Sequence, residues 1–371
     1  MTASTTPSKS HRAAVLFGAK ELRLEQVPTP ELQPHEVQVA PRATGICGTD
    51  LHYYQNGRNG VYVVETPLVL GHEAAGEVVA VGAAVTTLRV GDRVAVEPQL
   101  ACLACGQCSS GRYNLCPRMR FNGSASARPP AQGSLQELWN HPARLCYRLP
   151  DSVGFDEGAL VEPLSVALHS VRKGRLEAGQ RVVITGAGAI GLLCARVAKI
   201  SGASSVVMVD VDEARLTFAR RQKLADQTFR AATSVAAGES AADFAARTAR
   251  EMREALGVGE ADLALECTGV ESCVNICLAA AAPGSKVILV GMGRPLQQVN
   301  LGMALTREME LIGVWRYANT FQPAIDLIAA GMVDAKSLIT HRFPMEKAAE
   351  ALELALTKPA DLIKCVLTSG G

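Results

Sequence analysis

The sequence predicts a two-domain α/β protein, in which a β-rich domain is combined with a doubly wound parallel sheet. Its 371 residues are enough for two hydrophobic cores. Up to about residue 150, short apolar runs are separated by Gly and Pro, which is typical of antiparallel strands. After about residue 163, fully apolar runs alternate with segments of helical periodicity, and this alternation predicts a parallel sheet covered by helices.

The expected elements follow from these runs in chain order. In the β-rich region, strands are predicted over 13–17, 36–41, 76–82, 91–98 and 145–150. In the alternating region, strands are predicted over 181–186, 205–210, 262–267, 286–291 and 310–315, and helices over 189–202, 213–222 and, weakly, 231–250. The C-terminal region returns to mixed character, with a predicted helix over 321–331 and a predicted strand over 362–368.

The composition argues against nucleic-acid and membrane partners. The formal net charge is +1, so the chain as a whole does not attract nucleic acid or anionic lipid. The apolar runs are shorter than the ~18 residues that a membrane helix needs. Residues 1–12, MTASTTPSKSHR, lack the apolar stretch of a secretory signal, and we expect them to form a disordered tail of a cytoplasmic protein.

The chain contains 11 cysteines. An odd number without a secretory signal argues against a disulfide framework and favours a reducing compartment, the cytoplasm. Six of the cysteines lie in apolar segments and are predicted to be small buried side chains: Cys146, Cys194, Cys267, Cys273, Cys277 and Cys365.

A glycine motif, GAGAIG, lies between the predicted strand 181–186 and the helix that follows. Gly186, Gly188 and Gly191 have the G-x-G-x-x-G spacing of a dinucleotide-binding turn, in which pyrophosphate binds at the helix N-terminus. The next predicted strand ends in Asp210, whose carboxylate can accept hydrogen bonds from the adenosine ribose and repels a 2′-phosphate. The motif therefore predicts NAD as the cofactor, in preference to NADP.

Four cysteines form a second motif, with the spacing C-x2-C-x2-C-x7-C. Cys102, Cys105, Cys108 and Cys116 suit a tetrahedral zinc site, because short turns can direct paired sulfurs at one ion. The first three positions and the final Cys-Pro also match a bacterial iron–sulfur run, but the last gap in that run has three residues instead of seven. Four free thiols are a further alternative, disfavoured because clustered thiols on a loop oxidise readily.

A third constellation combines ATGICGTD with LGHEAAGEVVAVG. Cys47, His72 and Glu73 offer a thiolate, an imidazole and a carboxylate, which are suitable zinc ligands. Three protein ligands would leave the fourth position open, as a catalytic zinc ion requires. The alternative is a buried Cys47 and a surface turn at GHE.

Together these segments resemble the zinc-dependent medium-chain dehydrogenase/reductase family. GHEAAGEVVAVG, GDRVAVEP, the four-cysteine segment and VVITGAGAIGLL match that family in order and spacing, from about residue 13 to 368. The resemblance implies a GroES-like catalytic domain, residues 1–164 and 313–371, and a Rossmann coenzyme domain, residues 165–312. It also implies that the cysteine lobe, about residues 99–118, binds a structural zinc ion.

Within that family, ICGTDLHYY, VEPLSVALH, ECTG, WRYANT and THRFPMEKA resemble the polyol dehydrogenases that act on sorbitol, xylitol or L-arabinitol. In that group a glutamate follows the histidine ligand, and here this residue is Glu73. The resemblance implies a catalytic zinc ion held by Cys47, His72 and Glu73, with Glu162 bound directly or through a water. Thr49 would assist proton transfer.

The resemblance implies NAD-dependent, reversible oxidation of a sugar alcohol's secondary hydroxyl to the ketose, by a homotetramer. The implied substrate-binding residues are Tyr53, Phe121, Glu162, Arg316 and Tyr317. The implied coenzyme-binding residues are Gly186, Gly188, Ile190, Gly191, Asp210, Val211, Arg215, Cys267, Val290 and Met292.

Two segments depart from the polyol dehydrogenase pattern. Residues 120–136 are a few residues longer than their counterpart, which bears on the preferred length of the substrate, and WRYANTFQPA differs from the commoner RYCNTWP. Two other functions remain as alternatives. One is a threonine, alcohol or glucose dehydrogenase of the same fold, and the other is a non-catalytic relative that binds only nucleotide.

Overall fold

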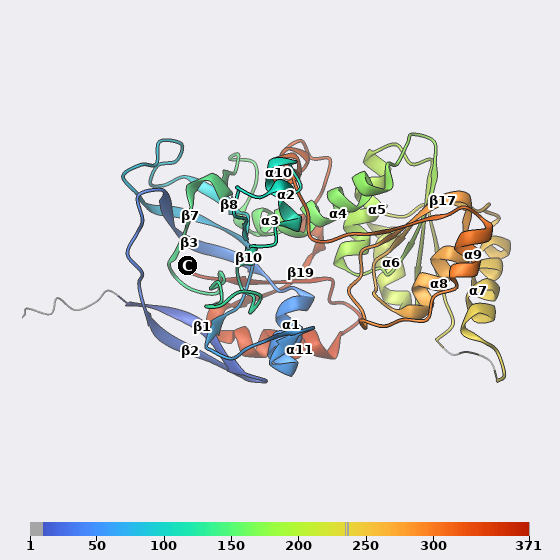
Figure 1. Ribbon diagram of the computed structural model, residues 1–371, viewed down its shortest axis with the longest axis horizontal. Helices are drawn as coiled ribbons and strands as arrows, with labels where there is room; N and C mark the ends of the chain where they lie inside the picture. The colour runs from blue at the N-terminus through green and yellow to red at the C-terminus, as the bar shows by residue number, and fades with distance from the viewer. Residues whose placement is uncertain (1–9, 234, 236, 371) are drawn as a thin grey trace, which may run out of the picture. The chain divides into compact units, whose positions relative to one another are not determined.

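The computed structural model describes residues 10–233, 235 and 237–370, and the chain divides into two compact units. Unit 1 comprises Met1–Glu162 and Phe321–Gly371, and unit 2 comprises Pro163–Thr320. The predicted fold class is confirmed, because unit 1 is rich in strands and unit 2 is built on one parallel sheet (Figure 1). The functional domain boundaries predicted after residues 164 and 312 stay predictions.

A seven-stranded sheet runs through unit 1 in the order β12-β8-β7-β3-β20-β19, with β11 also paired to β3. Neighbouring strands are antiparallel except β19 and β20. The central strand β3 therefore lies between β7 and β20, which come from opposite ends of the chain. The strands are β3 (Glu36–Gly45), β7 (Glu73–Val81), β8 (Arg93–Val96), β11 (Trp139–Pro142), β12 (Cys146–Arg148), β19 (Ile339–Pro344) and β20 (Lys364–Thr368).

Smaller sheets complete unit 1. They contain β1 (Ser10–Gly18), β2 (Glu21–Pro28), β4 (Arg58–Asn59), β5 (Tyr62–Val63), β6 (Leu68–Val69), β9 (Gln99–Leu100) and β10 (Arg120–Phe121). The strand β1 begins at Ser10, so the expected disordered tail is wrong for residues 10–12, and residues 1–9 of that prediction lie outside the described residues.

Helices cover the strands of unit 1. They are α1 (Gly48–Asn56), α2 (Gly106–Ser109), α3 (Phe155–Ala159), α10 (Phe321–Ala329) and α11 (Ala348–Thr357), with 3-10 turns η1 (Tyr113–Leu115), η2 (Ala143–Leu145), η3 (Lys336–Leu338) and η4 (Met345–Lys347). Leu16 of β1, Tyr53 of α1 and Leu352 of α11 are fully buried in one core cluster. The helix α4 (Val161–Gly174) starts at the end of the first segment of unit 1 and continues in unit 2.

Unit 2 is a six-stranded sheet, in the order β15-β14-β13-β16-β17-β18, in which all neighbours are parallel. Figure 1 shows helices on both sides of this sheet. The strand order reverses at β13, and ligands bind at such a switch point in open α/β sheets. The elements are β13 (Arg181–Thr185), β14 (Ser205–Asp210), β15 (Gln227–Arg230), β16 (Ala261–Glu266), β17 (Ala281–Leu289), β18 (Glu310–Gly313), α5 (Ala189–Ile200), α6 (Glu213–Arg221), α7 (Ala241–Leu256), α8 (Glu271–Ala280) and α9 (Leu301–Thr306).

The weak helix predicted over 231–250 is wrong in its first half. The helix α7 begins only after Ser240, whose side chain caps it by accepting a hydrogen bond from the Asp243 N–H. Before that cap, Gly238 has a φ of +78°, which interrupts a right-handed helix. Among the described residues, the helices are all too short or too polar to cross a membrane.

Candidate active site and metal centres

Cys47, His72 and Glu73 lie together in unit 1. Cys47 follows the end of β3 and is the N-cap residue of α1, and Glu73 is the first residue of β7. One ligand atom from each of the three lies within 4.8 Å of the others. His72 and Glu73 are each only 2% exposed, so the alternative of a surface turn at GHE is wrong. Gly71 has a φ of +89°, and this left-handed turn directs the chain into the buried site.

Asp50 supports this cluster, although the sequence alone did not identify it. Its carboxylate accepts hydrogen bonds from the backbone N–H groups of Cys47 and Gly71, both at 3.0 Å. One of its oxygens also lies 3.6 Å from Nδ1 of His72. Asp50 therefore connects the segments that carry the thiol and the imidazole. The sequence signal for Asp50 was its position in the motif ATGICGTD, in which it is the only acidic residue.

The donor set of this cluster fits a zinc ion. Cys47 is half-buried, and desolvation of its thiol, followed by the negative charge of Glu73, raises its pKa. A bound divalent cation would deprotonate such a thiol outright. Nδ1 of His72 is also buried without a hydrogen-bond partner. One sulfur, one nitrogen and one carboxylate donor at this separation are suitable for zinc and leave its fourth position open.

Glu162 and Thr49, the other predicted catalytic residues, both belong to unit 1, Glu162 at the start of α4 and Thr49 in α1. Glu162 is in the first turn of α4 and is 6% exposed. It is outside the three-residue cluster, but its charge contributes to the raised pKa of Cys47. The Thr49 hydroxyl accepts a hydrogen bond of 3.5 Å from the Asn59 side chain. Zinc binding by Glu162 and proton transfer by Thr49 stay predictions.

The loop of residues 120–136 lies beside the cluster. The Phe121 ring packs edge-on against the His72 ring, with centroids 5.2 Å apart. Tyr53 is fully buried, and its hydroxyl is hydrogen-bonded to the Ser124 hydroxyl at 2.9 Å and to the Ala125 N–H at 3.0 Å. The Tyr53 hydroxyl therefore holds the loop in place, and substrate contact by Tyr53 and Phe121 stays a prediction.

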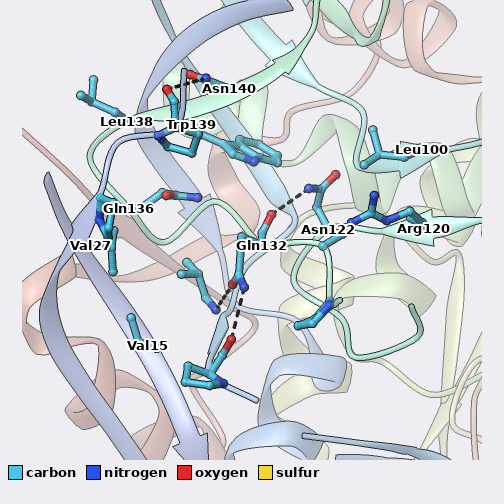
Figure 2. A pocket seen from close by; sticks show the side chains of 16 residues that line it. Val15, Val27, Leu100, Arg120, Asn122, Gln132, Gln136, Leu138, Trp139 and Asn140 are labelled. Carbon is cyan, nitrogen blue, oxygen red and sulfur yellow. Dashed lines mark hydrogen bonds between the residues drawn. The ribbon is translucent and has the colours of Figure 1, made fainter. Parts of the chain in front are cut away.

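Gln132 anchors the same loop to Pro67 and to Val69 of β6, and Figure 2 shows its hydrogen bonds. Its side-chain oxygen accepts from the Val69 N–H at 2.6 Å, and its side-chain nitrogen donates to the Pro67 carbonyl at 3.2 Å. These bonds lie at a cavity of about 370 Å³, which is lined by apolar side chains such as Val15 and by amides such as Asn140. None of the predicted site residues lines this cavity.

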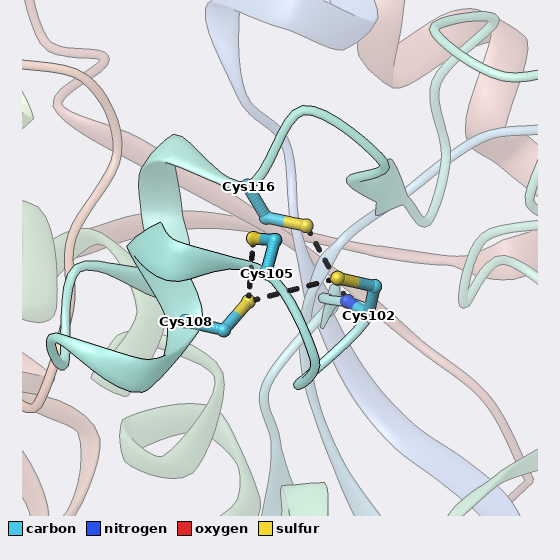
Figure 3. Close-up of side chains that lie close together, drawn as sticks. All are labelled: Cys102, Cys105, Cys108 and Cys116. Atoms are coloured by element: carbon cyan, nitrogen blue, oxygen red, sulfur yellow. Dashed lines mark hydrogen bonds between the residues drawn. The ribbon is translucent and has the colours of Figure 1, made fainter.

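The four cysteines of the lobe turn their sulfurs toward one another (Figure 3). Sγ of Cys108 lies 3.5 Å from Sγ of Cys105 and 3.9 Å from Sγ of Cys102. A tetrahedral zinc ion with Zn–S bonds of about 2.3 Å would place its sulfurs about 3.8 Å apart. The observed spacing fits zinc, and all four thiols are free of disulfides. Arg118 donates a hydrogen bond to the Cys102 sulfur at 3.2 Å, which stabilises the thiolate form.

A buried carboxylate attaches the lobe to the sheet. Glu97 accepts hydrogen bonds of 2.9 Å from the hydroxyls of Tyr113, which precedes Cys116, and of Tyr147, which lies in β12. Burial nevertheless raises the pKa of Glu97, against the lowering effect of these bonds. The backbone oxygen of Glu97 pairs with the buried His141 ring at 2.9 Å.

The glycine motif forms the turn between β13 and α5. Gly186 has a φ of +96°, Gly188 is the N-cap residue of α5, and a Cβ at position 191 would lie 1.8 Å from the Gly186 carbonyl oxygen. The third glycine is therefore required for close packing of helix on strand. Asp210, at the end of β14, accepts hydrogen bonds from Ala187 N–H at 2.6 Å and Asp212 N–H at 2.9 Å.

The remaining predicted coenzyme residues lie around the carboxyl ends of the same strands. Ile190 is in α5, Arg215 in α6, Val211 follows β14, Cys267 follows β16, and Val290 and Met292 follow β17. Cys267 and Cys273 are half-buried, so the prediction of buried thiols is wrong for these two: Cys267 directly follows β16, and Cys273 lies in the first turn of α8. The other four of that group are buried.

Arg316 and Tyr317 belong to unit 2, between β18 and α10. Arg316 has a left-handed φ of +53°, which is uncommon for a residue with a side chain and is frequent at ligand sites. Its guanidinium lies over the Trp315 ring, 4.9 Å from the centroid, and Tyr317 is fully buried. Their contact with substrate stays a prediction.

Comparison with known proteins shows the family of this chain. Residues 33–151 match the alcohol dehydrogenase GroES-like domain, and residues 189–330 match the zinc-binding dehydrogenase domain. Sorbitol dehydrogenase of Gallus gallus is 42% identical over 96% of this chain and 95% of its own length. The chain belongs to the polyol dehydrogenase group of the zinc-dependent medium-chain dehydrogenase/reductase family.

Two further oxidoreductases agree with this family assignment. A probable D-xylulose reductase A of Aspergillus clavatus is 40% identical, over 95% of both chains. An alcohol dehydrogenase of Escherichia coli CFT073, solved in complex with NADH, is 26% identical, with a TM-score of 0.86 over 97% of this chain and 99% of that chain. The alternatives of a threonine, alcohol or glucose dehydrogenase, or of a non-catalytic relative, are not favoured.

Proposed function

We propose that this chain oxidises a secondary hydroxyl of a sugar alcohol, such as sorbitol, L-arabinitol or xylitol, to the ketose and transfers the hydride to NAD. The observation that carries this proposal is the cluster of the half-buried Cys47 with the buried His72 and Glu73, in which a glutamate is the third donor. It occurs in a chain that is 42% identical to a sorbitol dehydrogenase. The relatives are named for a polyol and for a ketose, which suits a reversible reaction.

Cys47, His72 and Glu73 would hold the catalytic zinc ion, and Cys102, Cys105, Cys108 and Cys116 the structural one. When bound, the catalytic ion supplies Lewis acidity that makes a substrate hydroxyl easier to deprotonate. The buried Glu162 takes up the hydroxyl proton directly or through a water, and the Thr49 hydroxyl offers a second route to solvent. The four-cysteine lobe has no part in the chemistry.

In unit 2, the chain binds and orients the coenzyme, which accepts the hydride. The N–H groups at the start of α5 face the pyrophosphate, because the second glycine lets the backbone approach it. Asp210 accepts hydrogen bonds from the adenosine ribose and repels a 2′-phosphate. Arg316 donates to the hydroxyls of the polyol, and Tyr317 and Glu162 accept from them.

We also propose that the protein acts in the cytoplasm as a homotetramer. A reducing compartment suits the 11 free cysteines, five of which lie in the two clusters that are arranged for metal binding. The tetramer is proposed from the family resemblance alone. Light scattering of the purified protein on a sizing column measures the mass, and a monomeric or dimeric mass would exclude the tetramer.

NADH formation with a panel of pentitols, hexitols, ethanol and 2-propanol tests the function, with the ketose products identified. We expect good turnover of at least one polyol and very poor turnover of both simple alcohols, because buried polar groups in the site would lose their partners. Cys47→Ser should abolish turnover in a folded protein. The matched control, Cys146→Ser, changes a buried thiol outside the site and should retain turnover. Preference for ethanol would overturn the polyol proposal.

A further inference from the structure

The strand β20 carries a lysine that is buried beside the candidate metal site. The Lys364 side chain is 6% exposed, and its ammonium forms an ion pair with Oε2 of Glu73. The same ammonium donates a hydrogen bond of 2.9 Å to the Ile46 carbonyl, one residue before Cys47. A buried ammonium is strongly unfavourable unless it is paired, so these two contacts keep Lys364 in place.

Lys364 contacts Glu73 across an intervening strand. Glu73 lies on β7 and Lys364 on β20, and β3 lies between them in the sheet. Neighbouring strands are about 4.8 Å apart, so the backbones of β7 and β20 are separated by about 10 Å. The ion pair therefore forms above the backbone of β3, and the residue of β3 beneath it must leave room.

Gly45 is that residue of β3. It pairs with Glu73 of β7 on one side and with Val366 of β20 on the other. A Cβ at position 45 would lie 2.1 Å from Oε2 of Glu73 and 3.0 Å from Cε of Lys364. Gly45 does not have a left-handed φ, so the glycine is needed for the space it leaves and not for its backbone conformation.

We propose that Lys364 is a positioning residue that holds the Glu73 carboxylate toward Cys47 and His72, through the gap left by Gly45. The inference rests on the proposed zinc site. A glutamate side chain has three rotatable bonds, and an ion pair that engages one oxygen restricts all of them. Carboxylates that bind metals are themselves held by partners in this way, and loss of such a partner typically lowers metal affinity about 10–100-fold.

The local charges support the same role. The thiolate form of Cys47 and the carboxylates of Glu73, Asp50 and Glu162 would bring four negative charges to the metal site. Lys364 contributes a positive charge that attracts Glu73 and does not compete for the metal, because an ammonium has no lone pair to donate. Lys364 thus moderates repulsion within the cluster while leaving its donor set intact.

Competition with a chromophoric zinc chelator tests the proposal, because it measures the dissociation constants of both zinc sites without any turnover. We expect Lys364→Met to raise the dissociation constant of the catalytic ion about 10–100-fold and to leave the four-cysteine site unchanged. Lys364→Arg, which keeps the charge, should restore most of the affinity. Gly45→Ala should weaken the same site, because its Cβ displaces the Glu73 carboxylate.

Arg42→Met is the matched control. Arg42 lies on β3 and forms a cross-strand ion pair of 3.2 Å with Glu77 of β7, away from the metal ligands. Its removal should leave both zinc affinities within about twofold. A double-variant cycle then separates positioning from general packing: in a Glu73→Gln background, Lys364→Met should cause no further loss of zinc.

Several results would overturn the inference. They are an unchanged catalytic zinc affinity in Lys364→Met, an equal loss at both zinc sites, or the same loss in the Glu73→Gln background. If Lys364→Met does not fold, an unchanged affinity in Gly45→Ala overturns it instead. A wild-type protein without a second zinc ion would refute the proposed zinc site itself, whereas a wild type with two ions and an unaffected Lys364→Met refutes only the positioning role.

Discussion

Replacing Asp210 by Asn should sharply weaken binding of NADH. In the structure both carboxylate oxygens are engaged, one by the Ala187 N–H at 2.6 Å and the other by the Asp212 N–H at 2.9 Å. Asparagine has nearly the same shape but only one acceptor oxygen, and its amide nitrogen would face a second N–H donor. The substitution therefore leaves one backbone N–H of the coenzyme turn, or of the segment after β14, without an acceptor.

The size of the effect follows from that count. An N–H without its acceptor disorders the turn, which NADH must then restore on binding; one lost hydrogen bond to a charged group costs about 1.5–3 kcal/mol, or about 10–150-fold in the binding constant. The predicted bonds to the ribose hydroxyls also depend on this carboxylate, so the loss should lie toward the upper part of that range. Repulsion of a 2′-phosphate should fall at the same time, and the preference for NAD over NADP should narrow.

Fluorescence titration with NADH measures the dissociation constant, and the ratio of kcat/KM for NAD and NADP measures the preference. Asp212→Asn is the matched control, since Asp212 also accepts two backbone N–H bonds, as the cap of α6, and asparagine is an equally good cap. We expect the control to change the dissociation constant less than about threefold. An Asp210→Asn protein that binds NADH as tightly as the control would refute the role given to Asp210.

Three other predictions concern metal, acid stability and substrate. The purified protein should contain about two zinc ions per chain, measured by elemental analysis. Cys105→Ser should lower the unfolding temperature, because the four-cysteine lobe would lose its zinc ion. Iron instead of zinc in the preparation would contradict both expectations. Burial lowers the pKa of His141 to about 4 from its ordinary 6.5. As the pH falls, this histidine is therefore protonated in the unfolded chain before it is protonated in the folded protein. The free energy of unfolding is unaffected by His141 above pH 6.5 and decreases as the pH falls from 6.5 to 4. Urea unfolding should show that His141 lowers the free energy of unfolding by about 2 kcal/mol at pH 5 relative to pH 7.5, and that His141→Gln removes this contribution. An equally steep loss of stability in the variant would exclude His141 as its cause. Arg316→Ala should lower kcat/KM for the polyol about 10–150-fold and leave any residual ethanol oxidation unchanged. The control is Arg175→Ala, because Arg175 also has a positive φ but is not a predicted site residue. Equal effects of the two substitutions on polyol turnover would remove Arg316 from the site.

Much of the fold could be predicted because its signals are local. The alternating strands and helices of unit 2 and the turn at Gly186 each depend on hydrophobic periodicity or on glycine spacing within a few residues. The prediction failed where a local signal was weak. An Ala-rich composition favoured a helix from residue 231, but the positive φ of Gly238 and the cap at Ser240 delay α7.

By itself, the sequence determined the class of protein and its metal chemistry. The four cysteines of the lobe fall within one short segment, so their spacing favours zinc over an iron–sulfur cluster, and the glycine turn with Asp210 predicts NAD from a similarly local signal. Only the tertiary structure decided how the catalytic cluster is supported. Lys364 and Ile46 are 318 residues apart, and sheet pairing through Gly45 brings the lysine to Glu73. Hydrophobic periodicity does not predict such a contact, because the contact depends on β7, β3 and the C-terminal strand β20 becoming neighbours in one sheet.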